Sequence, residues 1–401
     1  MNLAEVSQYQ KKYRDNLLES VIPFWLRNGV DYEYGGYISC LDREGEIYNY
    51  EKSVWFQGRT LWILSHLMKQ YGEFDVWRKA ADCGYEFIQK CISPSGRMAF
   101  SVTREGKTIQ QRRYYFSETF AAIALCEYGN VTGNKDAIAL GRKVYGVARS
   151  LYTGELDENK PKFNAETFDF KGFSAPMILL STAQTMRAND VENTEEYNND
   201  IKMYLKDMKD FYKKEHHALF ENVKKNGECN LEVQRGRLLN PGHAIEGAWF
   251  LMDEYEYTKD EELKTLALDI LNDSFKNGWD EEMGGLRSFV DALGKPVEPL
   301  ESDMKMWWPH CETIIAYLKA YRLTGDEKYL EMFKLVDEYT FSHFIDEEYG
   351  EWYGYLHRDG TVSHTQKGSH WKGPYHHPRC LMLCESILDD IANDRPIRTI
   401  L

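Results

Sequence analysis

The stretch NPGHAIEGAWFLMDEYEYTKDEELKTL, residues 240–266, predicts two helices joined by a short turn. Its apolar side chains recur at positions i, i+3, i+4 and i+7, which places them on one face of a helix: Ile245, Ala248, Trp249 and Met252. Thr258 and Asp260 then interrupt the apolar pattern, and Asp is a favoured N-cap residue for a second helix. The stretch is therefore typical of an antiparallel helical hairpin.

Similar turns recur along the chain. Gly133 precedes Asn134, and Gly325 precedes Asp326, in each case between two helical apolar patterns. Glycine commonly ends a helix in a left-handed conformation, and Asn or Asp commonly begins the next helix. We therefore expect about twelve helices, with starts near residues 3, 54, 73, 116, 134, 173, 195, 243, 260, 310, 326 and 378.

The order of these elements predicts the fold class. Successive helical hairpins with no parallel-strand pattern between them favour an all-α (α/α)6 barrel, with six inner and six outer helices. Segments 31–47, 280–297 and 346–362 share an acidic start, a glycine and alternating apolar residues, and 93–109 is a looser copy. This alternation predicts short β-hairpins on one rim of the barrel. No Pro/Ser-rich linker interrupts residues 1–401, so we expect a single domain.

Three histidines stand at equivalent places, each just before an apolar helical stretch. They are His243, His310 and His376, and a separation of about 66 residues indicates one structural unit repeated around an axis. The repetition should bring the three imidazoles to the same rim, where helix N-termini disfavour imidazolium. A neutral imidazole near pH 7 can act as a base. The pattern predicts a proton-transfer site, although a single histidine in this place is often only a capping or packing residue.

Composition excludes several function classes. A net charge of −15 and a pI near 5.3, with no Lys/Arg-rich run, make nucleic acid and anionic membranes unfavourable partners. Residues 1–21 carry charges throughout and contain no long apolar run, so we expect neither a signal peptide nor a membrane span, and a cytoplasmic protein. The eight cysteines are scattered without a C-x-x-C pair, which is typical of reduced thiols.

Metal and nucleotide sites lack their usual motifs in this sequence. Four histidines crowd one stretch, but their spacing matches no compact ligand signature, so we predict no metal site: His364, His370, His376 and His377. A P-loop, a G-x-G-x-x-G element after a strand and a G-x-S-x-G elbow are also absent. Nucleotide-dependent and serine-hydrolase chemistry therefore lack their usual residues.

Four motifs, in order, resemble those of the N-acylglucosamine 2-epimerase family. They are WFQGRTLW (55–62), RLLNPGHAIE (237–246), WWPHCE (307–312) and GPYHHPRCL (373–381). The resemblance covers nearly the whole chain, and the combination of four motifs is highly specific. It implies an (α/α)6 barrel, in agreement with the fold expected from the repeats. It also implies that a homodimer is common and that some members respond to ATP.

The resemblance implies roles for individual residues. His243 and His376 match the family's acid/base pair, which lies on opposite sides of the substrate carbon. Arg59 matches the arginine of the Q-G-R motif and suits a developing enolate oxygen, the alternative being a helix-start salt bridge. Six further residues are expected to contact substrate: Glu246, His310, Glu312, Trp308, Asn240 and Arg379. Because His377 directly follows His376, the motif leaves open which of the two faces the cleft.

The implied reaction is the interconversion of N-acetyl-D-mannosamine and N-acetyl-D-glucosamine. Carbon 2 of the ring-opened sugar loses a proton to one histidine and regains a proton from the other. No cofactor is required, and an effect of ATP stays open. Three alternatives remain: epimerisation of another aldose, of the mannose/glucose or cellobiose type; glycoside hydrolysis by Glu118 with Glu246 or Glu312; and sugar binding without catalysis.

Overall fold

A computed structural model describes residues 1–111, 114–156, 163–164 and 166–395. Six helices surround the centre of the molecule: α3 (Val54–Tyr71), α5 (Phe116–Thr132), α7 (Ser174–Asn189), α9 (Pro241–Thr258), α11 (Trp307–Thr324) and α13 (His376–Ala392). The outer layer contains α4 (Asp75–Lys90), α6 (Lys135–Thr153), α8 (Thr194–Met208), α10 (Glu261–Gly278), α12 (Glu327–His343) and the N-terminal α1 (Leu3–Asp15) and α2 (Ile22–Asn28). A π-helical segment, Asn16–Val21, joins α1 to α2.

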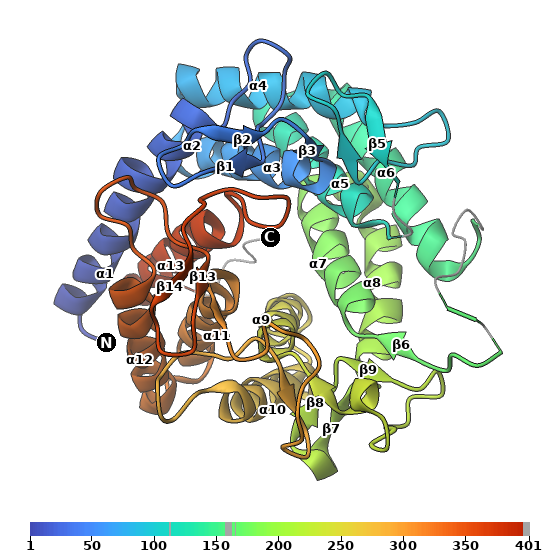
Figure 1. The fold of residues 1–401 in the computed structure, drawn as a ribbon, viewed down its shortest axis with the longest axis vertical. Coiled ribbons are helices and arrows are strands. Elements are labelled where there is room, and N and C mark those ends of the chain that lie inside the picture. The colour runs from blue at the N-terminus through green and yellow to red at the C-terminus, as the bar shows by residue number, and fades with distance from the viewer. Residues whose placement is uncertain (112–113, 157–162, 165, 396–401) are drawn as a thin grey trace.

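The inner helices form a closed ring, and each packs against an outer partner. Contacts join α3 to α5, α5 to α7, and so on through α13, which returns to α3. The outer helices α4, α6, α8, α10 and α12 pack against the inner helices that precede them, and α1 packs against α13 (Figure 1). The (α/α)6 barrel expected from the sequence is therefore confirmed.

The turns between paired helices follow the predicted chemistry. Gly133 and Gly325 end their helices in the left-handed conformation, with φ of 71° and 67°. The side chains of Asn134, Asp260 and Asp326 accept hydrogen bonds from backbone N–H groups in the first turn of the helix that follows. The predicted starts at 243, 310 and 378 lie two or three residues inside α9, α11 and α13. Each was placed at the histidine or proline of a motif, and these residues lie in the first turn of the helix.

Short strands occupy the connections. Three hairpins fall in predicted segments: β1 (Cys40–Leu41) with β2 (Ile47–Asn49), β4 (Ser101–Val102) with β5 (Thr108–Gln110), and β13 (Tyr355–Leu356) with β14 (Val362–His364). The remaining strands are β3 (Lys52–Ser53), β6 (Lys171–Gly172), β7 (Tyr212–Lys213), β8 (Ala218–Leu219), β9 (Asn222–Val223), β10 (Leu238–Leu239), β11 (Val290–Asp291) and β12 (Lys305–Met306). The hairpin expected within 280–297 is wrong, because β11 pairs with β10 from an earlier connection.

Buried aspartate–lysine pairs hold three of the rim loops. The Lys52 ammonium lies 2.9 Å from the Asp31 carboxylate and donates to the carbonyl of Gly35. Asp280 with Lys305 and Asp346 with Lys367 repeat this arrangement at 3.0 and 2.9 Å, and all three lysines are fully buried. An arginine from the turn of another hairpin completes each cluster: Arg104 on Asp31, Arg358 on Asp280 and Arg43 on Asp346. The loops are thus braced against one another.

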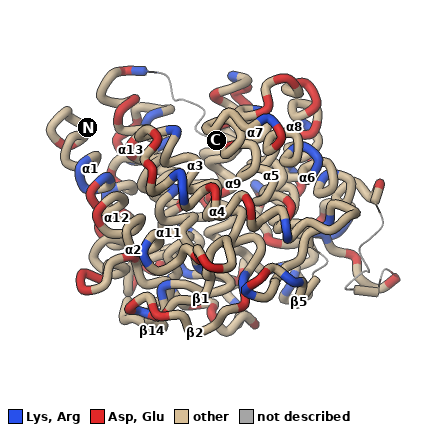
Figure 2. Tube along the Cα trace, turned by 90° about the horizontal axis from the view of Figure 1, so that it is seen from above, with Lys and Arg blue, Asp and Glu red and all other residues tan. Residues whose placement is uncertain are grey.

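At the other end of the inner helices, buried ion pairs connect neighbours in the ring. Glu127 of α5 pairs with His66 of α3 at 2.9 Å, and Glu254 of α9 pairs with Arg187 of α7 at 2.8 Å. Acidic and basic residues are scattered over the helices and the loops (Figure 2). Within the described residues, no helix combines the length and the apolar character needed to cross a membrane.

Candidate active site

A cavity of about 630 Å³ lies where the inner helices begin. Its size falls within the usual range for a small-molecule site. Every inner helix contributes to the lining, which includes Trp55, Arg59, Phe116, Phe120, Ile123, Met177, Ile178, His243, Glu246, Trp308, His376 and Arg379. The repeated histidine positions predict that the helix starts converge on one site. This is confirmed for His243 and His376, which line the cavity, but not for His310.

His243 is held in the first turn of α9 by two neighbours. Its backbone N–H donates to the Asn240 side chain, which caps the helix at 3.1 Å. Its ring Nδ1 lies 3.0 Å from a carboxylate oxygen of Glu221. The amide nitrogen of Asn240 also lies 3.0 Å from Nδ1, but the Glu221 carboxylate can only accept a hydrogen bond, so Nδ1 carries the proton and directs it at Glu221. The other ring nitrogen, Nε2, forms no hydrogen bond with the described residues, so it is available to substrate.

Glu221 decides the charge preference of His243. Burial by itself lowers the pKa of His243, but the nearby Glu221 carboxylate, its hydrogen bond and the charge of Glu246 outweigh burial and raise it above its ordinary value. His243 is therefore disposed to carry a proton near neutral pH, as a general acid must.

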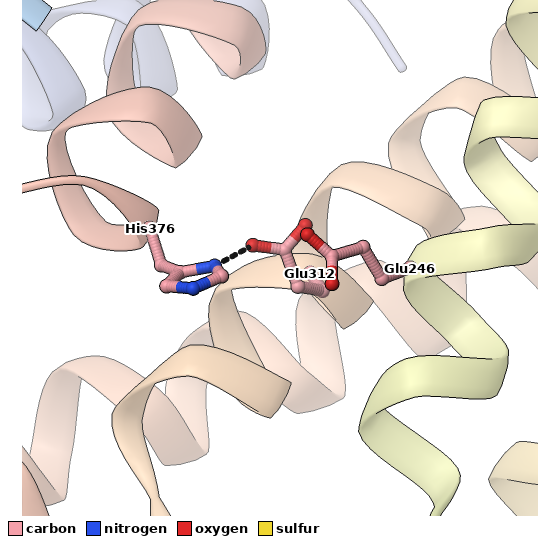
Figure 3. Close-up of side chains that lie close together, drawn as sticks. All are labelled: Glu246, Glu312 and His376. Carbon is pink, nitrogen blue, oxygen red and sulfur yellow. Dashed lines mark hydrogen bonds and ion pairs between the residues drawn. The ribbon is translucent and has the colours of Figure 1, made fainter. Parts of the chain in front are cut away.

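His376, at the start of α13, has the opposite preference. Its Nδ1 donates to Glu312 at 2.7 Å, and Figure 3 shows the two side chains meeting beside Glu246. Burial lowers the pKa of His376 well below its ordinary value; Glu246 opposes this, whereas Arg59 and Arg379 add to it. The imidazole of His376 is therefore disposed to be neutral, as a general base must be.

Trp308 places the two histidines in one site. The centroid of its ring lies 5.3 Å from that of His243 and 5.7 Å from that of His376. Two imidazoles that face one cavity with pKa values shifted in opposite directions form a suitable acid/base pair.

Arg59 extends from α3 into a cage of aromatic rings. Its guanidinium lies 4.8, 4.1 and 4.9 Å from the rings of Trp55, Phe120 and Tyr375. Burial lowers its pKa to about 10, so it stays charged. Its Nε is buried without a hydrogen-bond partner among the described residues, and no carboxylate there forms an ion pair with Arg59. A helix-start salt bridge therefore does not account for this residue.

His310 and His377 do not reach the cavity. His310 is fully buried, accepts from the backbone N–H of Leu286 at 2.9 Å and donates to the carbonyl of Met306 at 2.6 Å; burial lowers its pKa to about 3. The predicted substrate contact of His310 is therefore wrong. Both ring nitrogens of His377 are also engaged, with Glu351 and Asn16, so His376 is the histidine that faces the cleft.

Four other predicted contacts divide into two groups. Glu246 and Arg379 line the cavity. Asn240 and Glu312 do not line it and instead contact His243 and His376, so they lie behind the cavity wall rather than in it. Arg379 connects the two carboxylates, since its Nη2 lies 2.7 Å from both Glu246 and Glu312.

Three of these groups have ligand atoms close enough to hold a metal ion. One ligand atom each from Glu246, Glu312 and His376 lies within 4.8 Å of the others. The Arg379 guanidinium, however, already binds one oxygen of each carboxylate. A cation placed there would meet a fixed positive charge, so the residues present fit an ion-pair network better than a metal site.

Similarity to known proteins agrees with this geometry. Residues 36–380 match the family described as N-acylglucosamine 2-epimerase (GlcNAc 2-epimerase). The chain belongs to this family. It is 36% identical over 397 residues to N-acylglucosamine 2-epimerase of Rattus norvegicus, covering 96% of this chain and 93% of that protein. The human enzyme of the same name is 34% identical over 394 residues, covering 96% and 91%.

More distant relatives of the protein carry the name cellobiose 2-epimerase. Cellobiose 2-epimerase of Ruminococcus albus is 27% identical over 390 residues, covering 92% of this chain and 96% of that protein. The solved structure of cellobiose 2-epimerase from Bacillus thermoamylovorans superposes with a TM-score of 0.82 at 21% identity, covering 94% and 99%. As a family member, the protein is a sugar 2-epimerase.

The carboxylate pair considered for glycoside hydrolysis is not assembled in this epimerase. Glu118 is fully buried, pairs with Arg97 at 3.0 Å and accepts the backbone N–H of Met98. It does not line the cavity. The structure of an α-mannanase from Bacteroides thetaiotaomicron superposes with a TM-score of 0.61 at 10% identity, covering 97% of each chain, which shows a shared fold alone.

Glu221 is the functional residue that sequence reasoning missed. It precedes the two-residue strand β9 in a connection with no helical or alternating pattern. Its place is fixed by backbone pairing across the rim, where its N–H donates to Leu238 and its carbonyl accepts from Phe173. No local signal in the sequence marks it.

Proposed function

We propose that this protein interconverts N-acetyl-D-mannosamine and N-acetyl-D-glucosamine by moving a proton at carbon 2 of the ring-opened sugar. The observation that carries the proposal is the pair His243 and His376, which face one cavity on either side of Trp308 with opposite charge preferences. The choice of an N-acetylamino sugar is supported by relatives named N-acylglucosamine 2-epimerase at 34 to 37% identity.

The proton transfers follow from these charge states. The neutral Nε2 of His376 takes the proton from carbon 2, and the electrons of that C–H bond form the carbon–carbon double bond of an enolate. The negative charge moves to the oxygen on carbon 1, where Arg59 supplies a cation. Protonated His243 then returns a proton to the other face of carbon 2, and the carbonyl re-forms. The two histidines exchange roles in the reverse direction.

The neighbours of each group keep it ready for its step. Glu312 and Glu221 both accept from Nδ1, so each histidine presents Nε2 to the substrate. No carboxylate in the described part of the chain forms an ion pair with the partly desolvated Arg59. A fixed donor of this kind contributes roughly 3 kcal/mol to stabilising an oxyanion.

The test is an NMR time course in heavy water. We expect N-acetyl-D-mannosamine to give N-acetyl-D-glucosamine, with deuterium at carbon 2, because the histidine protons exchange with solvent. Mannose and cellobiose are incubated in parallel. Exchange in one of these two sugars without exchange in either amino sugar would reject the proposed substrate, and exchange in none would leave a sugar-binding protein.

Another aldose is the second candidate. It is favoured by the 27% identity to cellobiose 2-epimerase over 92% of this chain. The acid/base pair is equally suited to any aldose, because the acidic hydrogen lies next to the carbonyl in each of them. Groups that contact the substituents of carbon 2 separate an amino sugar from mannose or glucose, and room around carbon 4 also decides whether cellobiose fits.

A further inference from the structure

Among the described residues, the charged side chains that line the cavity come from helices other than α5 and α7 and from the loops. One face of α7 contributes Ser174, Met177, Ile178, Ser181 and Thr182, and α5 contributes Phe116, Phe120 and Ile123. No charged side chain of these two helices lines the cavity within the described residues. The rest of the lining contains both catalytic histidines together with Glu246, Arg379 and Arg59, whose guanidinium lies over the ring of Phe120. A substrate in this cavity therefore meets an uncharged surface on the side of α5 and α7.

The order of the inner helices determines what that surface contacts. His243 on α9 and His376 on α13 flank the reacting carbon, and Trp308 on α11 lies between them. Arg59 on α3 is assigned to the oxygen on carbon 1. Figure 1 shows α5 and α7 across the barrel from α11. One of the two remaining substituents of carbon 2, the nitrogen or carbon 3, must therefore point towards α5 and α7.

The chemistry of the two substituents separates them. Carbon 3 begins a chain of carbons that bear hydroxyl groups, and polar groups lose free energy when apolar side chains replace water around them. An N-acyl group ends in alkyl carbon, which gains free energy in the same surroundings. The apolar side chains of Met177, Ile178 and Ile123 therefore suit the acyl group.

We propose that the faces of α5 and α7 form an acyl pocket, and that it accepts acyl groups longer than acetyl. The proposal rests on the proposed function, since it concerns a substituent of the same substrate. Thr182 supplies a polar contact for the amide: its hydroxyl donates to the carbonyl of Ile178 at 2.7 Å, which leaves its oxygen free to accept the substrate N–H.

A second, smaller cavity provides room for a longer acyl chain. Its volume is about 110 Å³, and its lining shares Trp55, Phe116 and Trp371 with the main cavity. Met98 and Phe100 extend the apolar lining there. An alkyl chain that follows α5 past Phe116 would enter this space.

The first test is a series of N-acylmannosamines with acetyl, propanoyl, butanoyl and pentanoyl groups. Deuterium exchange at carbon 2 gives kcat/KM for each. We expect the value for the butanoyl sugar to stay within tenfold of that for the acetyl sugar. A fall of more than a hundredfold at propanoyl would overturn the proposal. Absence of exchange with the acetyl sugar itself would instead reject the proposed function, so the two failures are distinguishable.

Two substitutions locate the pocket. Ile178→Trp should lower the ratio of kcat/KM for butanoyl to acetyl at least tenfold, because the indole fills the space of the longer chain; an unchanged ratio would place the acyl group elsewhere. Thr182→Val should lower kcat/KM for the acetyl sugar about tenfold through loss of one hydrogen bond. Thr185→Val is the matched control, since its hydroxyl also donates to a carbonyl of α7, at 2.9 Å, but does not line the cavity. Equal effects of the two valine variants would also contradict the pocket, and thermal melts show whether each variant folds.

Discussion

Replacement of Glu221 by Gln tests whether a single carboxylate sets the protonation of His243. The substitution keeps an oxygen beside Nδ1 and removes one negative charge, which lies 3.0 to 3.2 Å from that nitrogen. A charge at this distance changes a neighbouring pKa by about 1 to 3 units, or roughly 1.4 to 4 kcal/mol. Burial then dominates, so the pKa of His243 should fall below its ordinary value.

The sign of the expected effect follows from the role of His243 as the acid. The active pair of histidines holds one proton, and kcat/KM falls when that proton is lost at high pH. In the wild type, the raised pKa of His243 puts this fall above about pH 6.5. In Glu221→Gln the fall should begin about 1 to 3 pH units lower, so that kcat/KM at pH 7.5 drops by roughly 10- to 1,000-fold.

The assay is the pH profile of deuterium exchange at carbon 2, from pH 5 to 9. Glu262→Gln is the matched control, because it removes the same charge from a side chain of α10 that is 85% exposed. A profile of Glu221→Gln that is lowered evenly, with its high-pH limb in place, would show that Glu221 does not control the charge of His243.

Three further predictions concern the histidines, metal dependence and the rim. His376→Ala should abolish turnover with little change in melting temperature. His377→Ala should lower the melting temperature, because buried Glu351 loses a hydrogen-bond partner, but the folded protein should stay active. The reverse pattern in the exchange assay would assign the base to His377. Dialysis against EDTA should leave kcat/KM unchanged, because Arg379 occupies the carboxylates of the only described cluster with metal-ligand spacing; activity restored specifically by an added divalent cation would contradict this. Lys305→Met should lower the free energy of unfolding in urea by about 3 kcal/mol, because it leaves buried Asp280 without one of its cations. A loss below about 0.5 kcal/mol would show that the buried pair is dispensable.

Sequence periodicity predicts where the helices lie, but it does not predict all the residues that form the site. The apolar pattern and the Gly–Asn and Gly–Asp turns predict the paired helices because these signals are local. His243, His310 and His376 all lie in the first turn of an inner helix, as its third, fourth and first residue. A place in a repeat therefore predicts which end of the helix a residue occupies, but not which way its side chain points. Whether its ring meets substrate or backbone depends on the loop above it. For His310, that loop places the N–H of Leu286 against the ring.

Contacts between residues that lie far apart in sequence are the main feature that the sequence does not predict. Glu221 approaches His243 from a different connection, and no spacing rule links the two. The buried lysines of the rim loops were missed for a related reason. Each follows its aspartate by more than 20 positions, and an isolated lysine in sequence is normally expected at the surface.

The arginine that completes each rim cluster has a practical consequence for protein engineering. Arg43, Arg104 and Arg358 each project from the turn of one hairpin and bind an aspartate that belongs to another loop. A hairpin transplanted from a relative to alter substrate choice must therefore keep its turn arginine. Otherwise the graft would strip a counter-ion from its neighbour, and the damage would emerge in a loop that was never edited.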